Sequence, residues 1–352
     1  MTRIGFVGAG AATAAAAFVL DSTTEATITV LEKSRGVCGR AATRRRGDIC
    51  YDYGANYVKS DDERVVDLLT EELDTEGLVD VTEPVYTFDE SGRVSEGRDA
   101  DDHKWTYEEG LTQIAKRLFA RAGATVERET RVETIARDAE GWTATDTDGT
   151  EWGPFDALVL NPPAPQTAQL LADADWDDPL RADLADAVGD VDYRTIYTAV
   201  LHYPIELDVP YYALVNTDKE HEVGWVSREE CKRGHVPDGE TLLIVQANPD
   251  WSVAHYDDPP AENAATLAEM TADIIGDDRL ADPDWTDTQG WRYALTEGAA
   301  ASGLLQSAGD DGLYFVGDWV TGEARVHAAL RSGLDAGERV AHRLSERASG
   351  TQ

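Results

Sequence analysis

The 352-residue chain is long enough for one large or two ordinary domains, and its 42% apolar content supplies a substantial core. Its 68 Asp and Glu residues against 31 Lys and Arg residues give a formal net charge of -37 at pH 7, spread over the whole length. Such a charge argues against a nucleic-acid partner and indicates the surface of a protein from a salt-accumulating halophile. The alternative is an acidic protein that binds cations or a basic partner.

The cysteine content indicates a reducing compartment. Cys38, Cys50 and Cys231 are too few for a disulfide framework and odd in number, so we expect a cytoplasmic protein. Residues 3–20 resemble a secretory signal, but glycines interrupt the apolar run early and a second strand pattern follows, which leaves export as the minor alternative. No other apolar stretch is long enough to span a bilayer, so a membrane is not an expected partner.

The first elements form a strand–helix–strand unit. Residues 4–7 predict a strand, residues 11–20 an alanine-rich helix, and residues 27–31 a second strand. Further elements are predicted as follows: an extended segment over 50–57, helices over 62–75 and 110–122, a strand over 125–131, hairpins over 85–97 and 142–153, and a buried parallel strand over 157–160.

The middle of the chain has another pattern. After an acidic helix over 166–188, β-rich stretches at 195–202, 211–215, 223–227 and 241–247 predict a separate antiparallel lobe. A helix over 259–275, a strand over 289–295 and a last core strand over 312–316 follow. We therefore predict two interleaved domains: a discontinuous nucleotide-binding domain (1–60, 100–165 and 290–345) and a substrate domain (61–99 and 166–289).

The turn after the first strand carries a nucleotide-binding glycine motif. Gly8 permits the tight turn and Gly10 lets the backbone approach a diphosphate, while Thr13 replaces the usual third glycine. Glu32, at the end of the second strand, is placed to accept hydrogen bonds from a ribose hydroxyl. Its carboxylate disfavours an NADP phosphate and fits FAD or NAD equally.

A second nucleotide element lies at the other end of the chain. An apolar run leads into Gly317-Asp318 and is followed by another helix. Two helix N-termini favour FAD, whose diphosphate binds the first while its ribitol and flavin ring need the second. Arg40 is best placed to neutralise the flavin diphosphate; for Arg44 to Arg46, a solvated charge run is the alternative.

Taken in order, these motifs resemble the renalase-like branch of the FAD-dependent amine oxidase superfamily. The resemblance covers essentially the whole chain. Many flavoproteins share the N-terminal motifs, so the C-terminal motifs are the ones that indicate this particular branch. The matching motifs are Gly8-Ala9-Gly10, Glu32, Cys38-Gly39-Arg40, Thr43-Arg44-Arg45, Asp52 to Tyr57, Gly317-Asp318-Trp319, Arg325-Val326 and Ser332-Gly333.

The resemblance implies an α/β fold: a glutathione-reductase-type Rossmann-like FAD-binding domain with an interleaved α+β substrate lobe built on an antiparallel sheet. It implies noncovalent FAD, because no cysteine lies near the C-terminal element. Val132 would touch the adenine side, and the helix from about Val326 would aim its amides at the flavin pyrimidine. The implied cofactor-binding residues are Gly8, Gly10, Ala11, Ala12, Glu32, Lys33, Gly39, Arg40, Gly54, Ala55, Asn56, Val132, Gly317, Asp318, Arg325, Val326 and His327.

The residues expected around the reacting ring depart from the family pattern. Cys38 replaces a glycine, Tyr53 a histidine and Asn56 a glutamine, and His327-Ala328 replaces a Glu-Gly pair. His327 is either a pocket residue or a half-buried side chain, and the aromatics either line the flavin or pack a core. The pocket candidates are Tyr53, Asn56, Tyr57, Trp225, Trp291 and His327.

The predicted activity is flavin-dependent oxidation. No Ser-His-Asp order stands out and the cysteines lack zinc spacing, as expected where the cofactor performs the chemistry. We expect hydride transfer from substrate to flavin, with O2 or another acceptor taking the electrons. The resemblance suggests an isomeric dihydronicotinamide related to NAD(P)H. The alternatives are amine oxidation, desaturation of a lipid-like molecule, and a non-catalytic flavin-binding or redox-sensing protein.

Overall fold

The computed structural model describes residues 2–97 and 102–350. The predicted domain boundary at residues 99 and 100 lies outside this part of the chain.

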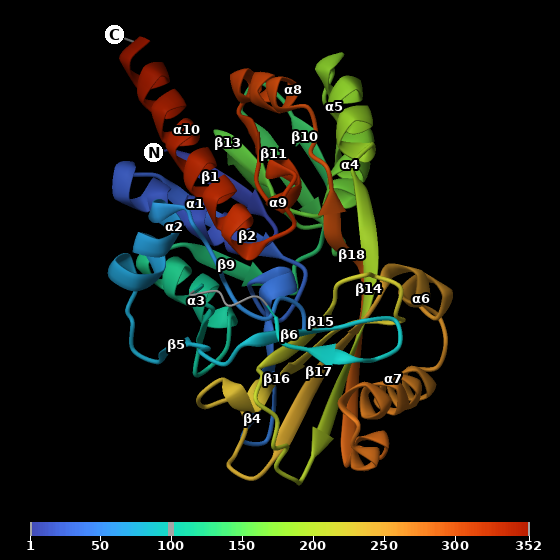
Figure 1. Ribbon diagram of the computed structural model, residues 1–352. Helices are drawn as coiled ribbons and strands as arrows, with labels where there is room; N and C mark the ends of the chain where they lie inside the picture. Colours follow the sequence, from blue (N-terminus) through green and yellow to red (C-terminus); the bar gives the residue numbers. More distant parts are fainter. Residues whose placement is uncertain (1, 98–101, 351–352) are drawn as a thin grey trace.

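A parallel sheet forms the centre of the nucleotide-binding half (Figure 1). Its strands are ordered β19-β13-β1-β2-β9, so strands from the start, middle and end of the chain lie side by side. Their bounds are β1 (Arg3–Val7), β2 (Thr27–Glu32), β9 (Thr125–Arg128), β13 (Ala157–Leu160) and β19 (Leu313–Phe315). The predicted core strands are confirmed here with only small shifts at their ends.

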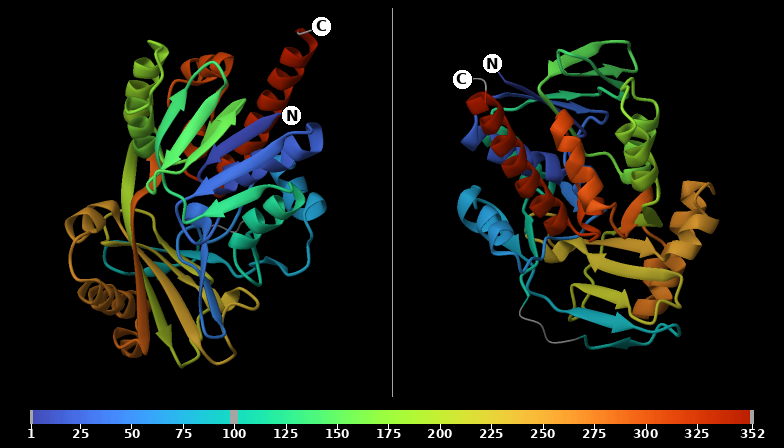
Figure 2. Two further views of the ribbon diagram at one scale, coloured as in Figure 1. Left: turned by 180° about the vertical axis from the view of Figure 1, so that it is seen from behind. Right: turned by 90° about the horizontal axis from the view of Figure 1, so that it is seen from above.

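Both faces of this sheet are buried, because successive side chains of a strand point to opposite sides. In β13, Ala157 and Val159 join one core while Leu158 and Leu160 join the other. The first core lies under three helices: α1 (Ala11–Thr23), α3 (Thr112–Arg121) and α10 (Val326–Gly350). Figure 2 shows α10 crossing the molecule beside the N-terminal elements.

Helices α1 and α10 pack at unusually close range. A Cβ at Gly333 would lie 2.1 Å from the Ala12 carbonyl oxygen, and one at Gly337 would lie 2.7 Å from Val19 Cβ. The small residues of α1, mostly alanine, face these glycines. The two ends of the chain are thereby joined in a single packed unit.

The second core is covered by a small sheet and further helices. The sheet is ordered β10-β11-β12, and the helices pack on the same core. The bounds are β10 (Val132–Arg137), β11 (Trp142–Asp146), β12 (Glu151–Phe155), α4 (Ala164–Ala172), α5 (Leu180–Gly189), α8 (Ser302–Ser307), η5 (Ala308–Asp311) and α9 (Asp318–Thr321). The single helix predicted over 166–188 is therefore wrong: a break that contains Pro179 separates α4 from α5, because proline cannot continue a helix from its preceding turn.

A larger sheet forms the substrate lobe. Its order is β18-β14-β17-β16-β15-β6-β7. The bounds are β6 (Val85–Phe88), β7 (Val94–Ser95), β14 (Asp192–Tyr203), β15 (Ala213–Asn216), β16 (Val223–Arg228), β17 (Thr241–Ala247) and β18 (Trp285–Glu297). The expectation of a purely antiparallel sheet needs one correction, since β6 pairs with β15 in parallel. The long pair β14 and β18 runs from this lobe into the upper half (Figure 1).

Helices flank the substrate sheet on the side away from the parallel sheet (Figure 1). They are α6 (Pro249–Ala254), which the sequence analysis missed, α7 (Pro260–Ile275) and η4 (Asp278–Ala281). The sheet's other side meets a hairpin, β3 (Thr43–Arg46) and β4 (Ile49–Asp52), through Ile49 and Tyr51.

The remaining elements are short. They are η1 (Gly39–Ala41), α2 (Glu63–Asp67), the π-helix η2 (Leu68–Glu72), β5 (Leu78–Asp80), β8 (Trp105–Tyr107) and η3 (Glu229–Cys231). The helix predicted over 62–75 is thus divided between α2 and η2. Both pack on the helical core of the nucleotide-binding half, although the predicted boundaries put them in the substrate domain. The domain division itself stays a prediction. Among the described residues, no helix has both the length and the hydropathy needed to cross a membrane.

Candidate active site

A large cavity lies where the two halves meet. Its volume is about 1970 Å3, and its walls come from the glycine turn, the 53–57 segment, the substrate sheet and the start of α10. Basic side chains outnumber acidic ones on these walls, whereas the whole chain has 31 basic against 68 acidic residues. The cavity is therefore the place where this acidic chain is suited to an anionic ligand.

The glycine turn after β1 has the geometry needed for a diphosphate. Gly8 has φ +92°, a conformation that favours glycine. Ala11 and Ala12 line the cavity at the start of α1, where backbone amides lack partners inside the helix. Thr13, at the usual third glycine, is fully buried and donates its hydroxyl to the Gly8 carbonyl at 2.7 Å. This bond braces the turn in place of close glycine packing.

Asn161 fixes this turn to the opposite end of the chain. Its Oδ1 accepts from Gly10 N at 3.0 Å, and its Nδ2 donates to the Val316 carbonyl at 3.0 Å. A Cβ at Gly10 would lie 2.3 Å from Asn161 Oδ1, so only glycine leaves room for the contact. Asn161 was not among the predicted site residues; the available signal was a polar side chain at the carboxyl end of a central parallel strand, where ligand sites gather.

Glu32 lies beside the same turn. Its carboxylate accepts from Ala9 N and from Ser34 N, both at 2.7 Å, and lines the cavity. A carboxylate has about four acceptor positions, so it retains capacity for a ribose hydroxyl. Lys33 and Val132 also line this end of the cavity.

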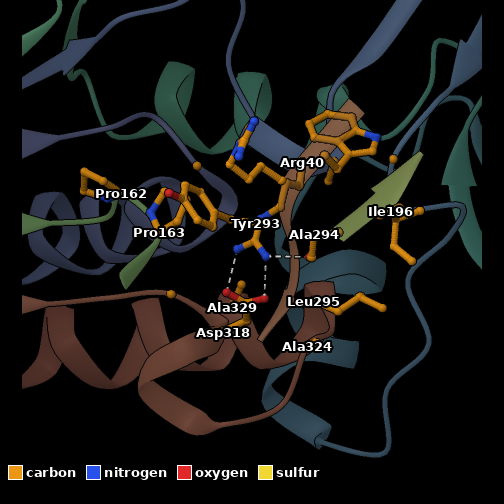
Figure 3. A pocket seen from close by; sticks show the side chains of 18 of the residues that line it. Arg40, Pro162, Pro163, Ile196, Tyr293, Ala294, Leu295, Asp318, Ala324 and Ala329 are labelled. Atoms are coloured by element: carbon orange, nitrogen blue, oxygen red, sulfur yellow. Dashed lines mark hydrogen bonds and ion pairs between the residues drawn. The ribbon is translucent and has the colours of Figure 1, made fainter. Parts of the chain in front are cut away.

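Arg40 joins both cofactor motifs (Figure 3). Its guanidinium donates to Asp318 Oδ1 at 2.6 Å and Oδ2 at 2.9 Å, and also to the Ala294 carbonyl at 2.8 Å. A forked pair of this kind is strong and fixes orientation. Arg40 was expected to neutralise a diphosphate. Instead, its charge is largely balanced by Asp318, and it connects the N-terminal segment, β18 and the C-terminal motif at the cavity wall.

Helix α10 begins at the cavity. Ala324, Arg325, Val326 and Ala329 line it, so the N-terminal end of a long helix, with its positive dipole, faces the interior. His327 differs from expectation: it is not among the lining residues, and its Nε2 lies 2.9 Å from Glu323 Oε1. Residues along a helix turn by about 100°, so the neighbours of a lining residue point elsewhere. The position of His327 does not support a pocket role.

The segment after β4 forms the wall between the two halves. Tyr53, Gly54, Ala55, Asn56 and Tyr57 all line the cavity. A Cβ at Gly54 would lie 2.1 Å from the Arg40 carbonyl oxygen, which explains glycine here. Ala55 N donates to that same carbonyl at 3.0 Å. This segment is therefore anchored to the cofactor side of the site.

Aromatic side chains line the cavity, as predicted for Tyr53, Tyr57, Trp225 and Trp291. Tyr53 and Trp291 are stacked with centroids 5.2 Å apart. The Arg44 guanidinium lies 4.1 Å from the Tyr53 ring centroid, a favourable cation–π contact. Tyr57 and Trp225 form a second group, with centroids 6.4 Å apart.

The arginine run has a role that neither sequence interpretation described. Arg44 donates to Asp287 at 2.8 Å and to Gln289 Oε1 at 2.6 Å, and so fixes the β3–β4 hairpin to β18. Arg45 pairs with Glu109, and Arg46 lies over the Trp285 ring. Only Arg44 among the three lines the cavity.

No cysteine is suited to a covalent flavin link. Cys38 lines the cavity but is buried, and burial raises the pKa of its thiol to about 12. A thiol that stays protonated is a poor nucleophile. Cys50 and Cys231 are not among the lining residues, and burial likewise raises the pKa of Cys231 to about 12. The site therefore fits a noncovalent FAD. It offers the backbone amides at the start of α1 for the diphosphate, the Glu32 carboxylate for the ribose, and glycines where the backbone must approach the cofactor closely.

Comparison with known families decides the assignment. The family model described as flavin-containing amine oxidoreductase matches residues 93–341, and the model of an NAD(P)-binding Rossmann-like domain matches residues 7–71. The chain belongs to the flavin-containing amine oxidoreductase family. It is an oxidoreductase that uses noncovalently bound FAD.

Solved structures share the fold of this flavoenzyme over nearly its full length. Cyclohexylamine oxidase from Brevibacterium oxydans has a TM-score of 0.73 at 15% identity, covering 98% of this chain and 99% of the other. Wild-type putrescine oxidase bound to putrescine gives 0.69 at 12%, covering 98% and 99%. A fatty acid isomerase from P. acnes that produces CLA gives 0.69 at 14%, covering 96% and 98%. The fold thus hosts several chemistries, and the substrate must be argued from the site.

Proposed function

We propose that this flavoenzyme is renalase-like and oxidises an isomeric dihydronicotinamide related to NAD(P)H. Held by the glycine turn after β1, by Glu32 and by the start of α10, FAD would supply two-electron oxidation: the substrate carbon would lose a hydride, and O2 or another acceptor would take up the electron pair. The chain's own contribution is to bind and orient the substrate over the flavin and to exclude water.

The observation that supports this substrate is a polar row across the substrate sheet. Thr198 is in register with Gln289 on one side and Gln246 on the other, and Gln246 is in register with Trp225. Gln289, Gln246 and Trp225 line the cavity. Because residues paired across strands share a face, these side chains form one surface beside the cavity.

Several groups on this surface have no partner among the described residues. Trp225 Nε1 and Thr198 Oγ1 are buried without a hydrogen bond. Gln246 donates its Nε2 to the Gly54 carbonyl at 2.7 Å, which directs its Oε1 away as an acceptor. Asn56 accepts from Ser227 Oγ at 3.1 Å through Oδ1, which leaves its NH2 group as a donor. Buried polar groups without a partner are costly, so a ligand that satisfies them gains affinity.

A carboxamide is complementary to this set. Its oxygen accepts from the Trp225 and Asn56 donors, and its NH2 donates to Gln246 Oε1. A cationic amine would instead favour a buried carboxylate. Of the two acids on the substrate-side wall, Glu297 is paired with Arg194 at 3.0 Å and Asp250 is exposed to solvent. A lipid chain would leave the polar row unsatisfied. The row therefore favours a neutral amide-bearing ring over the amine and lipid alternatives.

Anaerobic mixing tests the proposal. The FAD-loaded protein in high salt is mixed with aged NADH, which is rich in isomers, and separately with a panel of amines, while flavin absorbance is followed. We expect bleaching by the isomers; bleaching by amines alone would reject the proposal. Failure to bleach with any donor would favour the non-catalytic flavin-binding alternative.

A conservative variant tests the amide contact itself. Trp225→Phe keeps an aromatic ring but removes the indole N–H together with the second ring, so we expect the KM for the amide-bearing donor to rise about tenfold, which corresponds to roughly 1.4 kcal/mol. Trp152→Phe, on the small sheet outside the cavity, is the matched control. An equal KM in both variants would show that Trp225 does not take part in substrate recognition.

A further inference from the structure

Four ionisable side chains are buried together just outside the cavity. Asp52, Glu229, Lys232 and His235 are each 0% exposed. Lys232 Nζ lies 3.1 Å from Asp52 Oδ2 and 2.7 Å from Glu229 Oε1, and His235 Nδ1 lies 2.8 Å from Glu229 Oε2. We call these four residues the buried cluster.

The charges of the buried cluster balance. His235 places its second ring nitrogen 2.9 Å from the Tyr107 carbonyl, so both nitrogens face acceptors and the ring is protonated. Two cations thus face two carboxylates. Burial opposes charge on Asp52, but Lys232, His235 and hydrogen bonds from Thr43 and Leu111 outweigh it and lower the pKa of Asp52.

The buried cluster is not arranged as a metal centre. Ligand atoms of Asp52, Glu229 and His235 lie within 4.8 Å of one another, which is a spacing that could hold an ion. The Lys232 ammonium, however, contacts both carboxylates and supplies the cation that they need. An ion would have to displace a fully buried charge, which is strongly unfavourable.

Both carboxylates lie on segments that lead directly into the cavity. Asp52 precedes the 53–57 wall, and Glu229 follows Trp225 and Ser227 at the end of β16. Asp52 N donates to Glu229 Oε2 at 3.0 Å, which joins the two segments at the cluster. The Ser227 to Asn56 hydrogen bond joins them again at the cavity.

The buried cluster is also anchored to the cofactor half. Asp52 Oδ1 accepts from Thr43 Oγ1 at 2.6 Å and from Leu111 N at 2.9 Å, and Oδ2 accepts from Thr106 Oγ1 at 3.0 Å. With these contacts every acceptor position of the Asp52 carboxylate is used. The cluster therefore holds β4, the start of α3 and the end of β16 in one arrangement.

We propose that Asp52, Glu229, Lys232 and His235 are positioning residues that hold Asn56 and Trp225 in place on the cavity wall. The cluster acts on the two cavity walls through the backbone that follows Asp52 and precedes Glu229. The proposal extends beyond the choice of substrate, because it applies to whichever donor reduces the flavin.

Charge-balanced variants separate positioning from stability. Lys232→Met alone leaves an unpaired buried carboxylate and is expected to impair folding. The double variant Lys232→Met with Glu229→Gln removes one charge of each sign, and Glu229→Asp keeps all four charges while shortening one side chain. Arg279→Met, which breaks an exposed pair with Asp277, is the control.

The first readout is hydrogen–deuterium exchange, measured with and without FAD. In the double variant or in Glu229→Asp, we expect at least about tenfold faster exchange of the amides in residues 53–58 and 224–228, with no change in α1; a tenfold change is the effect of one modest interaction. Wild-type exchange in both segments of each folded variant would overturn the proposal.

The second readout is a double-mutant cycle with Asn56→Ala on the rate of anaerobic flavin reduction. If the cluster acts by placing Asn56, the Asn56→Ala change slows reduction in the wild-type background and has little further effect in the cluster variant. Additive effects would show that the cluster contributes only stability. The exchange readout does not depend on any substrate, so it stays decisive if the dihydronicotinamide assignment fails.

Discussion

The turn residue Gly10 lies where the cofactor site has no room for a side chain. A methyl group there would meet Asn161 Oδ1 at 2.3 Å and displace the side chain that accepts from Gly10 N and donates to the Val316 carbonyl. We expect Gly10→Ala to weaken FAD binding at least about tenfold, equivalent to one lost hydrogen bond. Titration of apoprotein with FAD measures this. Gly36→Ala, where a Cβ meets nothing within 4 Å, should bind normally; equal losses in both variants would contradict the account.

His235 gives the buried cluster a defined pH dependence. Burial alone would lower its pKa, but hydrogen bonds to Cys50 and Glu229 and the charges of Glu229 and Asp52 outweigh burial and raise the pKa from 6.5 to about 10. Protonation of His235 therefore stabilises the folded state. This contribution is fully present below pH 6.5 and is lost as the pH rises to about 10.

The measurement is urea unfolding of wild type and His235→Gln across that range at constant salt. The difference in free energy of unfolding should shrink steadily as the pH rises. A difference that stays constant between the two ends would show that His235 is neutral in the folded protein.

Among the elements, the close pairing of α1 and α10 joins the chain's two ends. Gly333→Ala would place a Cβ 2.1 Å from the Ala12 carbonyl, which is backbone and cannot move aside cheaply. We expect a loss of about 1–3 kcal/mol in the free energy of unfolding, as for other overpacked sites. Gly303→Ala in α8, with open space around its Cβ, should be neutral or slightly stabilising. Equal stability of the two variants would contradict close packing.

The sequence was most informative where one local rule determines structure. Short β-type runs predicted β1 and β2, alanine content predicted α1, and the apolar run that leads into Gly317 predicted the return strand β19. The break at Pro179 was missed, because a helix boundary inside a continuous helical pattern is hard to locate from sequence. The parallel pairing of β6 with β15 was missed, because it depends on contacts between distant segments.

The site was predictable to a similar extent. Most proposed cofactor residues line the cavity, because they belong to motifs with a backbone function. Asn161, Gln246 and the buried cluster were missed, since their roles arise only when distant strands come together. Of the two alternatives for His327, its position agrees with the half-buried side chain; the helix phase that decides between them cannot be read from the motif alone.

At the scale of the whole molecule, the net charge of -37 is the dominant feature. We propose that this surface is adapted to a salt-rich cytoplasm, where screening reduces repulsion among the acids. At about 0.01 M salt the Debye length grows to about 30 Å, so we expect loss of structure. Circular dichroism across a salt series measures this, and an unchanged spectrum in dilute buffer would contradict the proposal.

The central claim is that both ends of the chain and the substrate sheet enclose one FAD. Visible absorbance of protein purified in high salt, after addition of FAD and removal of the excess, tests it most directly. We predict a yellow protein with one FAD per chain, which is released on denaturation because the cofactor is bound noncovalently. A colourless protein under these conditions would contradict it.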